Sequence, residues 1–66
     1  MLKIYINGSS GKMGQSLTNL INQSQELNLV TKDISLSDVV IDFSHPDSTI
    51  EIIKDCSRNK IPLIIG

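Results

Sequence analysis

The sequence is poor in the residue types that many small folds and binding sites depend on. Its 66 residues contain one cysteine, one histidine, two prolines, one tyrosine, one phenylalanine and no tryptophan. The lone Cys56 excludes an intrachain disulfide and a Cys-x-x-Cys metal site, and it indicates a reducing compartment such as the cytoplasm. We expect no bound metal. The formal net charge is −1 and no run of like charges occurs, so nucleic-acid binding is disfavoured.

Long apolar runs are missing too. No stretch is long enough to cross a membrane, and the N-terminal MLKIYIN lacks the basic-then-apolar pattern of a signal peptide, so we expect no membrane partner. The composition, with 39% hydrophobic and 20% charged residues, is typical of a globular protein. A chain of this length forms at most one small domain, residues 1–66, and buries only about 60% of the surface that its unfolded chain exposes.

Apolar blocks alternate with amphipathic ones along the chain. The pattern predicts strands at residues 2–6, 27–31, 39–43 and 62–65, and helices at 12–24 and 46–59. Two sets of residues are expected on the inner helix faces: Met13, Leu17, Leu20 and Ile21 on the first, and Ile50, Ile53 and Cys56 on the second.

This alternation favours an α/β fold, a Rossmann-like parallel sheet with helices on its faces. The linker between the second and third strands is too short for a helix, so the fold is predicted to be small and incomplete, with four strands and two helices. We expect the strand order 27–31, 2–6, 39–43, 62–65. The linker must cross about 10 Å and return along about 17 Å of strand, and eight extended residues reach about 26 Å.

Three of the four glycines follow the first strand at a fixed spacing, as Gly8, Gly11 and Gly14. A strand that ends in such a loop and continues into a helix is the context of a phosphate cradle, in which the helix N-terminus offers free N–H groups. Ser9 and Ser10 add hydroxyl donors, and Lys12 adds a cation at the rim. The alternative is a β–α turn that is merely rich in glycine.

An acidic residue about 20 positions after the glycines often holds the ribose of a dinucleotide. Asp33 has this position, although it could equally be an ordinary loop acid, and the neighbouring Lys32 could instead meet the 2′-phosphate of NADP. Asp42 is unusual as a carboxylate in an apolar strand. We expect it to cap a backbone turn near the crevice; direct ligand contact is the alternative.

Three segments, taken in order, resemble dihydrodipicolinate reductase, an enzyme family of lysine and diaminopimelate biosynthesis. GSSGKMG (residues 8–14) is similar to its G-x-x-G-R-M-G loop, with Lys12 in place of arginine. DVVIDFSHPDST (38–49) resembles its D-V-x-I-D-F-[ST]-x-P-x-x-[ST] segment, and IPLIIG (61–66) its P-L-V-I-G segment. The resemblance covers nearly all of this chain, but only the N-terminal part of a full-length family member.

The resemblance implies an oxidoreductase that transfers hydride from NADH or NADPH to a cyclic unsaturated dicarboxylate. It implies that the loop holds the cofactor pyrophosphate through Gly8, Ser9, Ser10, Gly11, Lys12 and Met13. Asp33 would then lie near the adenosine ribose. Phe43 and Ser44 would line the nicotinamide side, and Gly66 would begin the loop that contacts both nicotinamide and substrate.

The sequence also departs from this family. The linker before residues 38–49 is shorter than in most members, and the family's catalytic His-His motif and lysine, in a later substrate-binding and tetramerising domain, are not among these residues. His45 belongs to a turn and Cys56 to a helix core, so we expect no catalytic residue and no activity from this chain alone. A non-catalytic nucleotide-binding module, such as a regulatory or CoA-binding unit, and an inactive truncated gene product are the alternatives.

Overall fold

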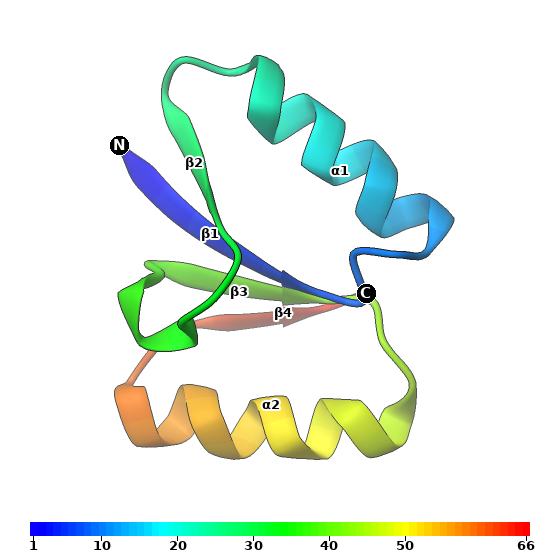
Figure 1. The fold of residues 1–66 in the computed structure, drawn as a ribbon. Coiled ribbons are helices and arrows are strands. Elements are labelled where there is room, and N and C mark those ends of the chain that lie inside the picture. Colours follow the sequence, from blue (N-terminus) through cyan, green and yellow to red (C-terminus); the bar gives the residue numbers. More distant parts are fainter.

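One parallel sheet organises the structure, a computed structural model that describes residues 1–66 (Figure 1). The elements in chain order are β1 (Leu2–Asn7), α1 (Lys12–Gln23), β2 (Leu27–Val30), the 3-10 helix η1 (Ile34–Leu36), β3 (Val39–Asp42), α2 (Pro46–Asn59) and β4 (Leu63–Ile65). The strands lie in the order β2-β1-β3-β4. The predicted α/β class, strand order and number of helices are therefore confirmed.

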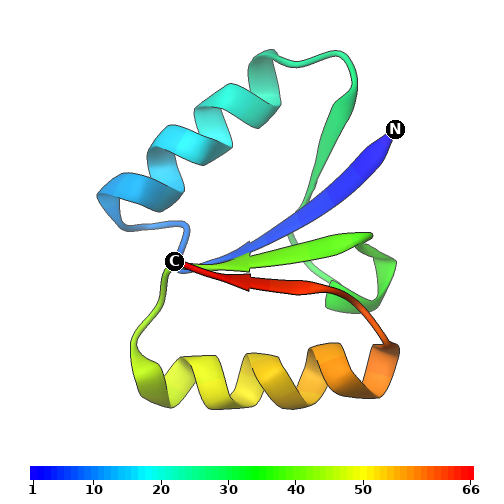
Figure 2. The same cartoon turned by 180° about the vertical axis from the view of Figure 1, so that it is seen from behind.

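The sheet places the carboxyl ends of its strands at one edge. All three strand pairs are parallel, with β1 between β2 and β3, and β4 paired to β3 alone. In the register, Asn7 at the end of β1 pairs with Asp42 at the end of β3, and Asp42 pairs with Ile65. In both views the C-terminus lies beside the loop between β1 and α1 (Figures 1 and 2). The three segments that resemble one family thus meet at a single edge.

The two helices cover opposite faces of the sheet (Figure 2). On the α1 face, Ile21 joins the β1 residues Ile4 and Ile6 in a buried cluster. On the α2 face, Ile52 and Cys56 join Val40 of β3. This arrangement follows from the chain direction, because right-handed crossovers that move outward from β1 and from β3 toward opposite edges place their helices on opposite faces.

The inner faces of the helices differ from the prediction. On α2, Ile52 rather than Ile53 is buried with Cys56, whereas Ile50 and Ile53 are exposed. Helix α2 packs on β3 and turns Ile52 toward Val40. Ile52 and Ile53 are adjacent and equally apolar, so spacing alone could not show which of them is buried.

On α1 the expected inner stripe is correct only in part. Ile21 is buried and Leu17 packs against the cluster around it, but Met13 and Leu20 are exposed. Gly14 takes the inward position at the first turn instead. The helix therefore approaches the sheet through a glycine, and the larger side chains beside it remain outside.

The linker between β2 and β3 forms a turn of 3-10 helix where a loop was expected. Asp33 caps it by accepting from the Ser35 backbone N–H at 3.0 Å, and Ile34 packs against the α2-side cluster. The linker thus crosses β1 on the α2 face of the sheet and joins β2 to β3. This confirms that the short connection can span the distance.

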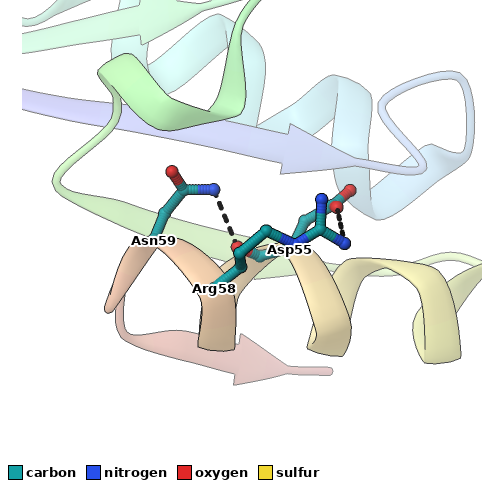
Figure 3. A network of polar contacts seen from close by, with 3 residues as sticks. All are labelled: Asp55, Arg58 and Asn59. Carbon is teal, nitrogen blue, oxygen red and sulfur yellow. Dashed lines mark hydrogen bonds and ion pairs between the residues drawn. The ribbon is translucent and has the colours of Figure 1, made fainter.

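The far end of α2 is polar and lies away from the carboxyl edge. Arg58 forms an ion pair with Asp55 at 3.5 Å, and the Asn59 side chain donates to the Asp55 carbonyl at 2.9 Å (Figure 3). The helix ends at Asn59, and Lys60 takes a left-handed conformation with φ 56°. No helix combines the length and the apolar character that crossing a membrane requires.

Much apolar surface stays accessible. The total accessible area is 4659 Å², compared with about 4,200 Å² for a typical monomer of this mass. Only nine residues are buried. The interior is small, as the length of the chain predicts, and β4 remains an open edge of the sheet.

Candidate functional site

A cavity of about 450 Å³ opens at the carboxyl edge of the sheet, between the glycine loop and the segment that follows β3. Its lining consists of Asn7, Gly8, Ser10, Gly11, Phe43, Ser44, His45 and Ser48. All of these residues except Phe43 are polar or glycine, and no carboxylate lines the cavity. The first turns of both α1 and α2 border the cavity, so unpaired backbone N–H groups of two helices lie near it. Such a lining suits an anionic ligand.

Gly8 makes the sharp turn after β1. Its φ is +85°, a conformation that L-residues with a side chain rarely adopt. A Cβ at this position would also lie 2.9 Å from the backbone of Phe43 and Ser44. The loop therefore approaches the end of β3 closely, which only glycine permits.

Gly14 allows α1 to pack against the same loop. A Cβ there would clash with the carbonyl oxygen of Gly8 and would lie 2.7 Å from the Cα of Ser9. The third glycine of the series thus has a steric reason within the protein itself.

Gly11 has no such reason. A Cβ at Gly11 would meet only the Gly8 carbonyl oxygen, at an ordinary contact distance of 3.7 Å. The backbone of Gly11 is extended, with φ −76° and ψ 171°, which any residue can adopt. Gly11 lines the cavity at the start of α1. No clash within the protein requires glycine here; glycine suits the N-cap position of α1, and it also leaves the backbone open to the close approach of a ligand.

The opposite wall is set by β3. Phe43 lines the cavity, and the Gly66 Cα lies against its ring: a Cβ on Gly66 would be 2.6 Å from Phe43 Cδ1. The Gly66 N–H donates to the Asp42 carbonyl at 2.8 Å, which extends the pairing of β4 with β3. Gly66 does not itself line the cavity; it leaves room for the ring of Phe43.

Asp42 is 1% exposed and lies directly behind this wall. Its Oδ1 accepts from the Ser44 backbone N–H at 3.0 Å and from the Asn7 amide at 3.1 Å, and its Oδ2 accepts from the Thr49 hydroxyl. The predicted turn cap is confirmed. Burial acts to raise the pKa of Asp42, but the hydrogen bonds from Ser44, Thr49 and Asn7 outweigh it, and the pKa lies below its ordinary value.

A second hollow, of about 120 Å³, lies between the ends of β1 and β2. Its lining consists of Tyr5, Ile6, Leu29, Val30, Ser9 and Thr31, and polar groups make up more than half of its surface. Ser9 belongs to the glycine loop, so this hollow adjoins the larger cavity across the loop. A flat ring with polar edges, connected to a phosphate, suits this arrangement.

Asp33 lies farther along the same edge. It borders a shallow groove with Lys32, Thr31 and Lys3, outside the two hollows already described. Its carboxylate is exposed and occupied by the Ser35 backbone N–H and hydroxyl, and these hydrogen bonds lower its pKa. The structure therefore gives Asp33 a capping role that the sequence analysis did not consider.

The structure brings together some of the residues predicted for the site and separates others. Gly8, Ser10, Gly11, Phe43 and Ser44 line the larger cavity. Ser9 lines the smaller hollow, whereas Lys12 and Met13 are exposed at the start of α1 and line neither. His45 is exposed as expected, yet it too borders the larger cavity.

Sequence analysis missed two lining residues, Asn7 and Ser48. The position of Asn7 as the last residue of an apolar strand, directly before the glycine loop, could have indicated it; Ser48 gave no comparable signal. No three residues among histidine, cysteine, aspartate and glutamate gather where they could hold a metal ion. Cys56 is buried, and that burial, together with the charges of Asp55 and Asp42, raises the pKa of its thiol.

A parallel sheet with strand order β2-β1-β3-β4, whose first strand ends in a glycine loop that leads into a helix, defines a Rossmann-like nucleotide-binding class of protein. Comparison with known proteins specifies the family. A family model described as "Dihydrodipicolinate reductase, N-terminus" matches residues 2–37 and 30–66. The chain belongs to this family.

Individual relatives agree with the family match. The chain is 32% identical to the 4-hydroxy-tetrahydrodipicolinate reductase of Methanoregula boonei, with 100% of this chain and 35% of the relative covered. Identity is 36% to the enzyme of the same name from Campylobacter fetus, covering 100% and 34%. It is 32% to that of Bdellovibrio bacteriovorus, covering 98% and 33%. The chain spans about a third of the length of the curated relatives it matches.

The comparisons also locate the main departure from the family. The match to the Methanoregula protein extends over 89 residues, more than the 66 of this chain, so the relative has additional residues opposite it. The family model matches in two parts that overlap at residues 30–37. This overlap covers η1 and the linker from β2 to β3, the segment predicted to be short.

Proposed function

We propose that this chain is the NADH- or NADPH-binding portion of a 4-hydroxy-tetrahydrodipicolinate reductase. In this proposal the pyrophosphate lies on the glycine loop at the start of α1, and the nicotinamide lies in the larger cavity against Phe43 and Ser44. A bound cofactor of this kind supplies the hydride, and the residues of this chain bind and orient it.

The observation that carries the proposal is the open space at Gly11. Gly8 and Gly14 are explained by the packing of the protein, whereas Gly11 is not. A phosphate that approaches the backbone within hydrogen-bond distance accounts for its lack of a side chain. The absence of a carboxylate from the lining of the cavity supports the same ligand, because a pyrophosphate carries negative charge.

The hollow beside Ser9 supports an adenine ring in that position. The hollow adjoins the loop, its lining by Leu29 and Val30 suits the flat face of the ring, and its polar surface suits the ring nitrogens. In this proposal the ribose lies near Thr31, which directly follows β2 and lines both this hollow and the adjoining groove, and Lys32 comes next. With the carboxylate of Asp33 occupied by Ser35, we favour NADPH, whose 2′-phosphate Lys32 and Lys12 could pair with.

Substrate binding and proton donation need side chains that this cavity does not contain. The lining offers His45 as its only titratable side chain, and His45 is an exposed helix-capping residue with no hydrogen-bond partner for its ring. We propose that the substrate, a small cyclic dicarboxylate, and the proton donor are held by a substrate-binding domain that also forms a homotetramer. This chain alone would then bind cofactor without turnover.

The experiment that tests the proposal is a set of calorimetric titrations of the chain with NADPH, NADH and coenzyme A at equal concentrations. Binding of both nicotinamide dinucleotides, tighter than that of coenzyme A and weakened in Gly11→Ala, supports the proposal. Tighter binding of coenzyme A would favour a nucleotide-binding module outside this enzyme family's chemistry. No binding of any of the three would overturn the proposed function.

A further inference from the structure

The buried carboxylate of Asp42 has no cationic partner. It is 1% exposed, and the only ion pair of the structure joins Arg58 to Asp55 at the far end of α2 (Figure 3). A buried charge is costly unless hydrogen bonds satisfy it. Two residues earlier on the same face of β3, Val40 fills its position with an apolar side chain. Position 42 thus differs from position 40, and the hydrogen bonds that the carboxylate accepts are what stabilises it there.

Its partners indicate what that use is. Asp42 accepts hydrogen bonds from Asn7 at the end of β1, from Ser44 after β3, and from Thr49 in the first turn of α2. These three residues come from three different segments around the cavity. A single carboxylate therefore connects all of them.

Asn7 adds a second junction. Its Nδ2 atom lies 2.9 Å from Ser44 Oγ, 3.1 Å from Asp42 Oδ1 and 3.2 Å from Ser48 Oγ. Its backbone carbonyl accepts from the Phe43 N–H at 2.9 Å. Asn7 is followed directly by Gly8, where a Cβ would lie 2.9 Å from the backbone of Phe43 and Ser44. The position of the glycine loop relative to β3 is thus fixed by side chains next to it in sequence.

We infer that Asn7 and Asp42 are positioning residues that hold the glycine loop and the Phe43–Ser48 segment at a fixed separation for the dinucleotide. This inference rests on the proposed function for the identity of the ligand. The two walls of the cavity are joined before a ligand enters, so less ordering is needed on binding. Asn7, Ser44 and Ser48 themselves line the cavity, so a shift in the network moves its surface.

The test uses three variants of the 66-residue chain and one control. Asp42→Asn keeps the shape but loses the charge, so its Oδ1 accepts more weakly from the Asn7 amide and the Ser44 N–H. Asn7→Ala removes the amide that contacts Asp42, Ser44 and Ser48. The double variant Asn7→Ala with Asp42→Asn measures how far the two effects depend on each other. Asp55→Asn makes the same chemical change on α2 away from the cavity, at the exposed ion pair with Arg58.

Two measurements are made on each variant: thermal unfolding by circular dichroism, and NADPH affinity from amide chemical-shift titration at a temperature where the variant is fully folded. We expect each single variant to weaken binding by on the order of tenfold, the double variant to weaken it by clearly less than the product of the two single effects, and Asp55→Asn to bind as the parent chain does. Unchanged affinity in both folded single variants, or a loss in the double variant equal to the product of the two single losses, would overturn the positioning role.

Amide hydrogen exchange keeps this result separate from that of the proposed function. In Asp42→Asn we expect faster exchange at the Phe43 and Ser44 N–H groups and unchanged exchange in the pairing of β1 with β2. If the parent chain binds no dinucleotide, the proposed function fails, and this local change still decides whether Asp42 holds the two walls together. Unchanged exchange at Phe43 and Ser44 would overturn that role.

Discussion

Replacing Gly11 with alanine separates the two explanations of a glycine-rich loop. If the loop is only a turn, alanine at this position is harmless, because the added Cβ would be 3.7 Å from its nearest neighbour and the backbone already has a φ of −76°. If the loop holds a phosphate, the added methyl group occupies the space of a ligand atom. Gly14→Ala is the comparison, because its Cβ would clash with the loop backbone in either case.

The structure sets the size of both effects. For the free energy of unfolding, alanine gains about 0.4–1 kcal/mol from a less flexible unfolded chain, and loses about as much as a poorer residue at the helix start. We therefore expect Gly11→Ala to change stability by less than about 0.5 kcal/mol, which in a domain of this size is a shift of roughly 2–4 °C in Tm. We expect its dinucleotide affinity to fall more than about tenfold, or about 1.4 kcal/mol.

Thermal unfolding and calorimetric titration with NADPH, applied to the parent chain and both variants, measure the two effects. Gly14→Ala should lower both Tm and affinity, whereas Gly11→Ala should lower affinity alone. Equal affinity of Gly11→Ala and the parent chain would refute the assignment of the space at Gly11 to a phosphate, and a large drop in its Tm would show that the fold needs this glycine after all.

Three further predictions concern charge, pH and catalysis. Replacing Lys12 and Lys32 together with glutamine should weaken NADPH more than NADH in parallel titrations, by about 1–3 kcal/mol for each lost contact with the 2′-phosphate, and equal losses would show that neither lysine contacts it. The pKa of folded Asp42 lies below its unfolded value of about 3.9, so its carboxylate stabilises the fold fully above about pH 4 and loses this contribution as pH falls through the folded pKa. Denaturant unfolding between pH 3 and 7 should show this loss of stability toward low pH in the parent chain and not in Asp42→Asn. Parallel plots of unfolding free energy against pH for the two proteins would contradict this prediction. The purified chain should not oxidise NADPH when dihydrodipicolinate synthase supplies the substrate, and turnover above the enzyme-free control would place the chemistry within these residues.

The fold could be predicted because its main signals are local. A short apolar strand, a glycine loop and a helix define the first unit, and the proline at position 46 marks the start of α2. The short linker after β2 left β3 only one free place beside β1. The helix faces were less certain, because Ile52 and Ile53 are neighbours with the same side chain, and the position of β3 decides which one is buried.

The candidate site was predicted from two kinds of signal: Gly8 and Gly11 from their spacing after a strand, and Phe43 and Ser44 from the family resemblance. All four residues follow strands whose ends meet, so their proximity follows from a parallel sheet. Asp33 caps a turn because Ser35 follows two residues later, which is a local signal. The prediction for Asp33 used its distance from the glycines instead and therefore assigned it to the ribose. The three contacts of Asn7 depend on the register of β1 with β3, which residue types do not specify.

Chemical-shift mapping of the isotope-labelled chain with NADPH tests the central claim most directly, because it reports where a dinucleotide binds even when binding is weak. The structure predicts concentration-dependent shifts at the amides of residues 8–12, at those of residues 43–45, 47 and 48, and at Leu29 to Thr31 beside the smaller hollow. The amides of Asp55 to Asn59 at the far end of α2 should stay in place. Shifts confined to other surfaces, or none at saturating NADPH, would contradict the claim that this edge of the sheet is a dinucleotide site.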